Sequence, residues 1–142
     1  MALGRPVDIA INHDPDAILM HKTNHPDTLH LTEDIFRVDL KKYVKGRHVA
    51  LMWASPDCTS HSKAKGGKPR ERGLRILPWA VYKHARTILP DVILMENVEE
   101  IQQWGPLDEE GHPIKARQGE DYRKFITAMK SLGYIFDCRE LI

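Results

Sequence analysis

Cys58 and Glu96 are the two side chains in this sequence whose types and positions fit covalent chemistry. Cys58 lies in a loop that begins after the apolar run 48–53, and Glu96 directly follows the apolar run 92–95. A thiolate is a good nucleophile, and a carboxyl group beside it can donate or accept a proton in the same reaction. The pair predicts nucleophilic catalysis if the fold brings the two runs together.

Each of these residues also has a plain structural interpretation. An isolated cysteine is commonly a small buried apolar side chain, and a glutamate at a strand end is usually solvated or ion-paired. The neighbouring basic segment would favour the thiolate form of Cys58. The second cysteine, Cys138, is far away in the sequence, so we expect neither a disulfide nor a paired-cysteine metal site.

Short apolar runs alternate with helical patterns along the chain. We expect strands at 7–12, 28–32, 48–53, 92–95 and 134–141. Helices are expected at about 15–24 and 74–89, and in a third segment whose apolar face carries Phe125, Ile126, Met129 and Leu132. Asp14 suits the N-cap of the first helix, Pro90 ends the second, and Gly133 follows the third. This alternation predicts an α/β fold with a doubly wound, mostly parallel sheet.

A parallel sheet would bring the two reactive side chains to one edge. The runs 48–53 and 92–95 are almost continuously apolar, as is typical of parallel strands buried on both faces. Their carboxyl ends would meet at the edge where such folds bind ligands, about 4.8 Å apart. The thiol of Cys58 and the carboxyl group of Glu96 could then act on one substrate.

Composition and charge limit the possible settings. A chain of 142 residues, 42% apolar, has room for one ordinary domain. It contains no apolar run long enough to span a membrane and no secretory signal at its start, so we expect a cytoplasmic protein. Segment 63–75 has six basic residues and one acid, whereas segment 96–121 has eight acids and two basic residues. The basic segment predicts contact with a polyanion.

Two motifs carry a family resemblance. Ser55-Pro56-Asp57-Cys58, followed by a loop rich in Ser, Lys and Gly, and Met95-Glu96-Asn97-Val98 resemble segments of the cytosine-5 DNA methyltransferases, particularly phage-type members. Three further motifs fit the same pattern: Asn24-His25-Pro26, Trp104-Gly105-Pro106 and Leu132-Gly133-Tyr134. The resemblance covers nearly the whole chain in order and spacing. It implies that residues 1–142 are part of a Rossmann-like methyltransferase catalytic domain, of the kind used in restriction–modification.

The resemblance also implies a role for each reactive residue. Cys58 would add to carbon 6 of a cytosine flipped out of double-stranded DNA, and Glu96 would contact ring nitrogen 3. Pro56 and Asn97 would support this site. The residues expected to contact DNA phosphates are Ser62, Lys63, Lys65, Lys68 and Arg70.

S-adenosylmethionine is the methyl donor that the resemblance implies. The residues in the positions that hold its adenosine part are Asn12, His13, Asp34 and Ile35. His13 belongs to a group of histidines with His21, His25 and His30, but their spacing matches no common zinc pattern, so we expect no metal.

The chain departs from the family pattern in several places. Asp57 replaces a proline, and Asn12 replaces an acidic ribose ligand. We find no glycine-rich turn before Val7, no Gln-x-Arg-x-Arg segment after Leu141 and no target-recognition domain. We therefore expect an incomplete sheet, without its first strand and C-terminal part, and weak or no catalysis by this chain alone. The missing glycine turn also counts against cofactor binding by the isolated chain.

Two other interpretations remain open from the sequence. The chain could be an inactive methyltransferase remnant or an oligomerising module that binds DNA weakly, with an open sheet edge that pairs with a second copy or a complementing chain. A cysteine hydrolase using His61 is the other, although no third orienting group is apparent.

Overall fold

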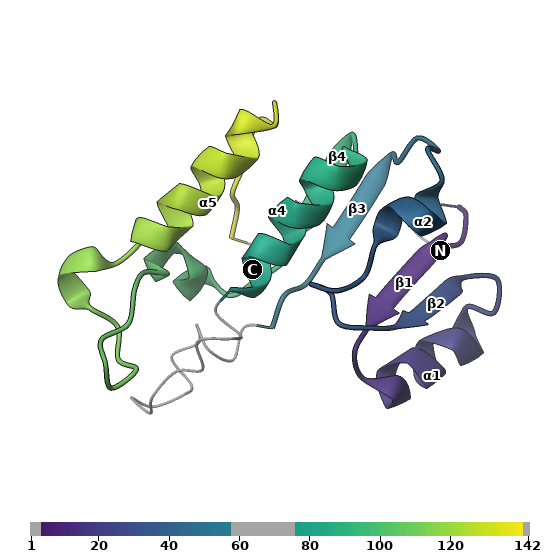
Figure 1. Cartoon of the computed structure of the whole chain (residues 1–142), viewed down its shortest axis with the longest axis horizontal. Coiled ribbons are helices and arrows are strands. Elements are labelled where there is room, and N and C mark those ends of the chain that lie inside the picture. Colours follow the sequence, from purple (N-terminus) through teal and green to yellow (C-terminus); the bar gives the residue numbers. More distant parts are fainter. Residues whose placement is uncertain (1–3, 58–75, 141–142) are drawn as a thin grey trace. The chain divides into compact units, whose positions relative to one another are not determined.

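The computed structural model describes residues 4–57 and 76–140 (Figure 1). The chain forms two compact units, Met1–Asp39 and Leu40–Ile142. Parallel strands alternate with helices in both, which confirms the predicted α/β class. Across the described ranges the strands form two separate two-stranded sheets, where the sequence had predicted one. No helix in these ranges is long and apolar enough to cross a membrane.

The first unit is a β-α-β element. Strand β1 (Ile9–Asn12) leads into helix α1 (Pro15–Asn24), which returns the chain to strand β2 (Leu29–Thr32). The strands pair in parallel, with Ile9 opposite Leu29 and Asn12 opposite Thr32. The Asp14 carboxylate caps α1 as expected, because it accepts a hydrogen bond from the Asp16 backbone N–H at 2.9 Å.

The second unit contains the other parallel pair. Helix α2 (Leu40–Val44) precedes strand β3 (Leu51–Ala54), and helix α4 (Leu77–Ile88) connects it to strand β4 (Val92–Met95). Two 3₁₀ helices, η2 (Glu99–Gln103) and η3 (Lys115–Arg117), then lead to helix α5 (Glu120–Ser131). Helix α4 ends as predicted, because Leu89 adopts a left-handed conformation with φ of 43° and Pro90 follows.

The predicted strand 134–141 is wrong for the part that the structure describes. Residues 134–140 form no strand, and Ile135 is 99% exposed. The segment does not pair with β3 or β4. Without such pairing, its backbone N–H and C=O groups lack the hydrogen-bond partners that a neighbouring strand would supply. A turn and side-chain contacts hold this segment instead: Gly133 turns the chain at φ +99°, the Tyr134 hydroxyl donates to the Pro90 carbonyl at 2.6 Å, and the Cys138 side chain is hydrogen-bonded to Tyr122 of α5.

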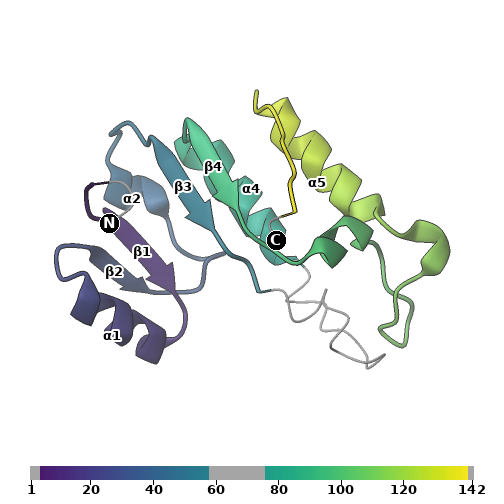
Figure 2. The same cartoon turned by 180° about the vertical axis from the view of Figure 1, so that it is seen from behind.

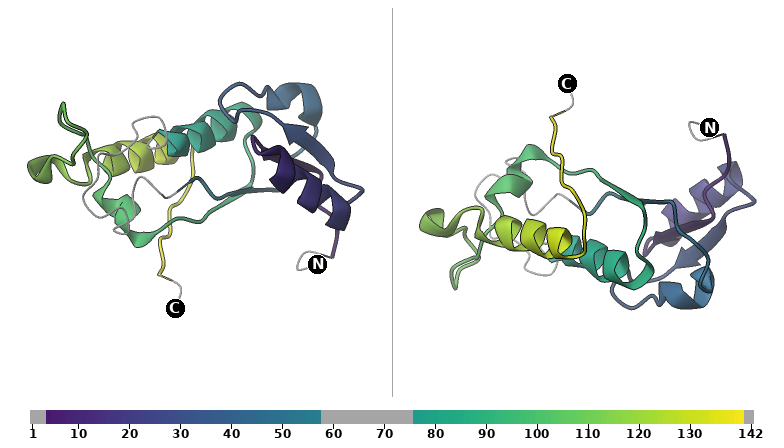
Figure 3. Two further views of the ribbon diagram at one scale, coloured as in Figure 1. Left: turned by 90° about the horizontal axis from the view of Figure 1, so that it is seen from below. Right: turned by 90° about the horizontal axis from the view of Figure 1, so that it is seen from above.

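The core of the second unit lies between the strands and the helices α4 and α5. Figure 2 shows β4 in front of α4, and Figure 3 shows the teal and yellow-green helices in one layer beside the strands. Three rings meet at this centre, with centroids 5.8–6.3 Å apart: Trp79, Trp104 and Phe125. Trp79 meets the other two edge to face, and Trp104 is tilted against Phe125. Met52, Ile93 and Met95 pack against the cluster from one face of the sheet. The helices therefore cover this face.

The opposite face of the same strands is open within the unit. Trp53 is 65% exposed, and Val92 and Leu94 are also exposed. The expectation that both faces are buried is therefore wrong for this unit, because α4 and α5 pack on one side only. Apolar runs such as 48–53 and 92–95 are nevertheless typical of strands that are covered on both faces.

Gly105 shows why the Trp104-Gly105-Pro106 motif needs glycine. A Cβ atom at this position would collide with the backbone carbonyl group of Arg117. The Trp104 carbonyl oxygen accepts hydrogen bonds from the backbone N–H groups of Asp121 and Tyr122, both at 3.1 Å. The motif thus holds η3 and the first turn of α5 close to η2.

Phe125→Ala tests the importance of the aromatic centre. Phe125 is 2% exposed, so we expect a cavity and a loss of about 3–5 kcal/mol in the unfolding free energy of the second unit. Urea unfolding followed by tryptophan fluorescence reports on this unit, because Trp53, Trp79 and Trp104 all belong to it. The matched control Ile135→Ala, at a fully exposed position, should change the free energy by less than about 0.5 kcal/mol. Equal losses in both variants would contradict this view of the core.

Candidate active site

The carboxyl ends of β3 and β4 lie side by side. Ala54 is paired with Met95, and the Glu96 backbone N–H donates to the Ala54 carbonyl at 3.0 Å. The segments that follow the two strands therefore leave the same edge of the sheet. The sequence argument for this placement rested on parallel strands, and the parallel pairing is confirmed.

Asn97 joins the two segments. Its side-chain Nδ2 donates to the Pro56 carbonyl at 3.0 Å, and its Oδ1 accepts from the Val98 backbone N–H at 3.0 Å. One planar amide thus makes two directional contacts, which fix its orientation. Pro56, two positions before Cys58, is held next to Glu96 by this contact. Both proposed supporting residues are therefore placed together.

Glu96 is exposed at this edge, so its carboxyl group is accessible to a substrate. Cys58 and His61 lie outside the described residues, as do all five predicted DNA contacts: Ser62, Lys63, Lys65, Lys68 and Arg70. The direct approach of the Cys58 thiol to Glu96 stays a prediction. The first described range ends at Asp57, in the segment that leaves β3 at the same edge of the sheet where Glu96 follows β4.

Trp53 and Ser55 form a contact that the sequence reasoning missed. The indole Nε1–H of Trp53 donates to the Ser55 hydroxyl oxygen at 2.9 Å. This bond ties the last part of β3 to the segment that leads to Cys58. The sequence signal for this contact was Trp53 itself, because the indole N–H of a tryptophan usually has a hydrogen-bond acceptor.

The four predicted cofactor residues gather at the corresponding edge of the first unit. Asn12 ends β1 and is followed by His13, while Asp34 and Ile35 follow β2 after one residue. The Glu33 backbone N–H donates to the Asn12 carbonyl at 3.2 Å, which keeps the two strand ends together. Parallel pairing again explains this convergence.

Two of these polar side chains also stabilise the local turns. Asn12 Oδ1 accepts from the Asp14 backbone N–H at 3.0 Å, and Asp34 Oδ1 accepts from the Phe36 backbone N–H at 2.8 Å. The amide NH₂ of Asn12 is the part of that side chain not used in this turn. At Asp34, the second carboxylate oxygen is the part not used in its turn.

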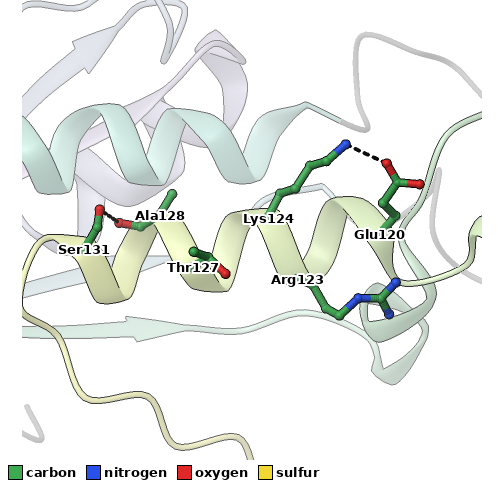
Figure 4. Close-up of a pocket in the computed structure, with 6 residues that line it drawn as sticks. All are labelled: Glu120, Arg123, Lys124, Thr127, Ala128 and Ser131. Carbon is green, nitrogen blue, oxygen red and sulfur yellow. Dashed lines mark hydrogen bonds and ion pairs between the residues drawn. The ribbon is translucent and has the colours of Figure 1, made fainter.

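No group of three His, Cys, Asp or Glu residues within 4–57 and 76–140 is arranged to hold a metal ion. A hollow of about 480 Å³ in the second unit is a shallow depression along α5 (Figure 4). Its charged groups pair with one another or with neighbours: Glu120 lies 2.7 Å from both Arg117 and Lys124. Hydrogen bonds from these two cations lower the pKa of Glu120 to about 2. This depression is an ion-paired helix surface and contains none of the predicted site residues.

A family model for C-5 cytosine-specific DNA methylases matches residues 5–139. The chain belongs to this family. Its fold is similar to the crystal structure described as a DNA modification methyltransferase encoded within a prophage of E. coli, with a TM-score of 0.64 and 22% identity. The match covers 91% of this chain and 31% of that one, so this chain spans about a third of its length. No match was found among curated proteins.

Asn97→Ala tests the link between the two strand ends. The variant removes two hydrogen bonds and leaves the half-buried Pro56 carbonyl without this donor, so we expect a loss of about 1–3 kcal/mol in unfolding free energy. Urea unfolding gives the value. The control Gln103→Ala, which removes an exposed amide from the nearby helix η2, should have little effect. A loss no larger than that of the control would argue against Asn97 as the link.

Proposed function

We propose that this chain carries the central chemical apparatus of a DNA cytosine-5 methyltransferase. The observation that supports this most is the shared edge of β3 and β4, where Asn97 holds Pro56 beside Glu96. Because the chain belongs to the C-5 cytosine methylase family, we propose that this edge delivers a nucleophile and a carboxyl group to one pyrimidine ring. Cys58 and Glu96 are the two catalytic residues in this proposal.

The chemistry follows from the poor reactivity of cytosine at carbon 5. The Cys58 thiolate adds to carbon 6, forming a C–S bond, and the electron pair of the 5,6 double bond makes carbon 5 nucleophilic. Glu96 hydrogen-bonds ring nitrogen 3 and so draws electrons away from carbon 6. After carbon 5 has taken up the methyl group, its proton leaves to a base, the C–S bond breaks and the ring regains its double bond.

S-adenosylmethionine would supply the methyl group as an electrophile. The residues proposed to hold its adenosine part are those at the edge of β1 and β2. The Asn12 amide NH₂ and the Asp34 carboxylate suit hydrogen bonds to ribose and adenine, and His13 and Ile35 suit contact with the adenine ring. These donor and acceptor types fit an adenosine without any metal.

Double-stranded DNA is the proposed macromolecular partner. The target cytosine must leave the helix stack before a thiol can reach carbon 6. The five DNA contacts proposed from the sequence carry four positive charges and would bind phosphates without reading sequence. We place residues 1–142 in the catalytic domain, and we propose a cytoplasmic enzyme of a phage or restriction–modification system.

Adduct formation with 5-fluorocytosine DNA tests this function. Fluorine at carbon 5 cannot leave as a proton would, so the covalent complex accumulates. In a protein that joins this chain to the family's glycine-rich turn and Gln-x-Arg-x-Arg segment, given S-adenosylmethionine and the modified duplex, we expect a denaturation-stable adduct, and we expect Cys58→Ala to form none. Cys138→Ala, which removes the exposed second thiol, is the matched control and should form as much adduct as the unaltered chain. An equal yield from Cys58→Ala would exclude Cys58 as the nucleophile.

A non-catalytic module is the second candidate, and one observation favours it. One face of the strands β3 and β4 is exposed and apolar, with Trp53 65% exposed and Val92 and Leu94 also exposed. Such a module would bind DNA weakly through the basic segment 63–75, and it would self-associate or pair with a complementing chain. Calorimetry tests the module, because binding of S-adenosylmethionine by this chain at about micromolar strength would count against it.

A further inference from the structure

Three imidazole rings meet in the first unit, away from the residues proposed to bind the cofactor. His21 lies on α1, His25 is the residue that caps its C-terminal end, and His30 lies in the middle of β2. The His21 and His25 ring centroids are 4.5 Å apart, and those of His21 and His30 are 5.0 Å apart. These contacts connect the helix to the strand on which it packs.

Only one hydrogen can lie between the two nitrogen atoms through which His21 and His30 meet. His21 Nδ1 and His30 Nε2 are 2.7 Å apart, so one nitrogen must donate and the other must offer a lone pair. If both rings were fully protonated, each nitrogen would carry a hydrogen and the two N–H groups would point at each other. At least one of the two rings must therefore be neutral for the contact to persist.

The burial of His30 indicates which ring donates. His30 Nδ1 is buried and has no hydrogen-bond partner within the described ranges. A proton on this atom would be a buried N–H group without an acceptor, which costs more than a buried lone pair. The favoured arrangement has the proton on His30 Nε2, donated to His21 Nδ1. An added proton is then unfavourable at either position: on His21 Nδ1 it would face the Nε2–H of His30, and on His30 Nδ1 it would be a buried N–H group without an acceptor in the described ranges.

Among the described residues, the two strands that pack on α1 carry no carboxylate that would offset a positive charge on His21. Helix α1 packs against β1, which has no ionisable side chain, and against β2, whose single ionisable side chain is His30. On α1 and its cap the nearest ionisable groups are Lys22 and His25, both basic, and Asp16 lies in the first turn of the helix. The pKa of His21 is lowered from its ordinary 6.5 by partial burial and by the charges of His25 and His30.

We propose that His21, His25 and His30 form an acid-sensitive latch, which fastens α1 to β2 while the His21–His30 pair is neutral and releases the helix when that pair gains a proton. The direction follows from linkage. Since the pKa of His21 is lower in the folded chain than in the unfolded one, its contribution to stability is complete above about pH 6.5 and is lost as the pH falls below that value.

Amide hydrogen exchange of the whole chain tests the latch. Between about pH 7.5 and about pH 5, with intrinsic exchange rates corrected, we expect the protection of the α1 amides to fall about tenfold for each unit of pKa difference. The amides of α4 provide an internal reference and should keep their protection. If the protection of α1 does not change over this range, the proposal is wrong.

His21→Gln separates the latch from a general effect of acid. Glutamine keeps a polar helical side chain that can accept from His30 but cannot titrate, so the fall in α1 protection should disappear. His112→Gln, which removes an imidazole beside Asp108 and Glu110 in the second unit, should leave the fall unchanged. The same fall in His21→Gln as in the unaltered chain would overturn the proposal.

An NMR titration of the imidazole groups in the unaltered chain provides a reading that does not depend on how the variant folds. We expect the pKa of His21 to lie below 6.5, the ordinary value for histidine. Titration of His21 at or above this value would overturn the proposal. Neither measurement uses DNA or cofactor, so their outcome is independent of the proposed methyltransferase function.

Discussion

The parallel pairing of β3 with β4 is the constraint on which the candidate active site depends. The pairing aligns Ala54 with Met95, and everything after those residues leaves the same edge of the sheet. A short connection could not produce this alignment, because parallel strands need a long crossover, and α4 provides it. The hydrogen bond from Asn97 to the Pro56 carbonyl then converts a shared edge into a fixed local geometry. The aromatic core around Phe125 supports both, since it fills the space beneath the covered face of the strands.

The first unit repeats this arrangement on a smaller scale. A single helix connects β1 to β2, and the strand ends bring Asn12 close to the segment that contains Asp34. Here one oxygen of each polar side chain closes the turn after its strand, and the other polar group of the same side chain is not used in that turn. A side chain that is already oriented by a turn presents its remaining hydrogen-bonding group in a defined direction, which favours ligand binding. The local turns therefore pre-organise this edge.

The sequence predicted those parts of the fold that local patterns determine. The N-cap Asp14, the end of α4 at Leu89-Pro90 and the strand 92–95 all follow from side-chain chemistry within a few residues. The strand expected at 134–141 failed because apolar alternation shows only that a segment can pair, and pairing requires a partner that the sequence of the segment does not name. The exposure of Trp53 was missed for a related reason: an apolar run indicates the capacity for burial on two faces, and the packed helices occupy only one.

The candidate active site likewise combines features that the local sequence determines with contacts that only the strand pairing determines. Glu96 and Asn97 were predicted from their position after a strand, and the strand pairing confirms that they leave the edge from which Pro56 also emerges. The amide contact to Pro56 joins residues 41 positions apart, so no local pattern could give its geometry. The contact of His21 with His30 is comparable, because helical periodicity explains the stacking of His21 on His25 but not the strand register that brings His30 to it. In both units the strand register brings together residues that are far apart in the sequence. A change of one residue in the register of β3 and β4 would remove the Asn97–Pro56 contact, and the same change in β1 and β2 would remove the His21–His30 contact.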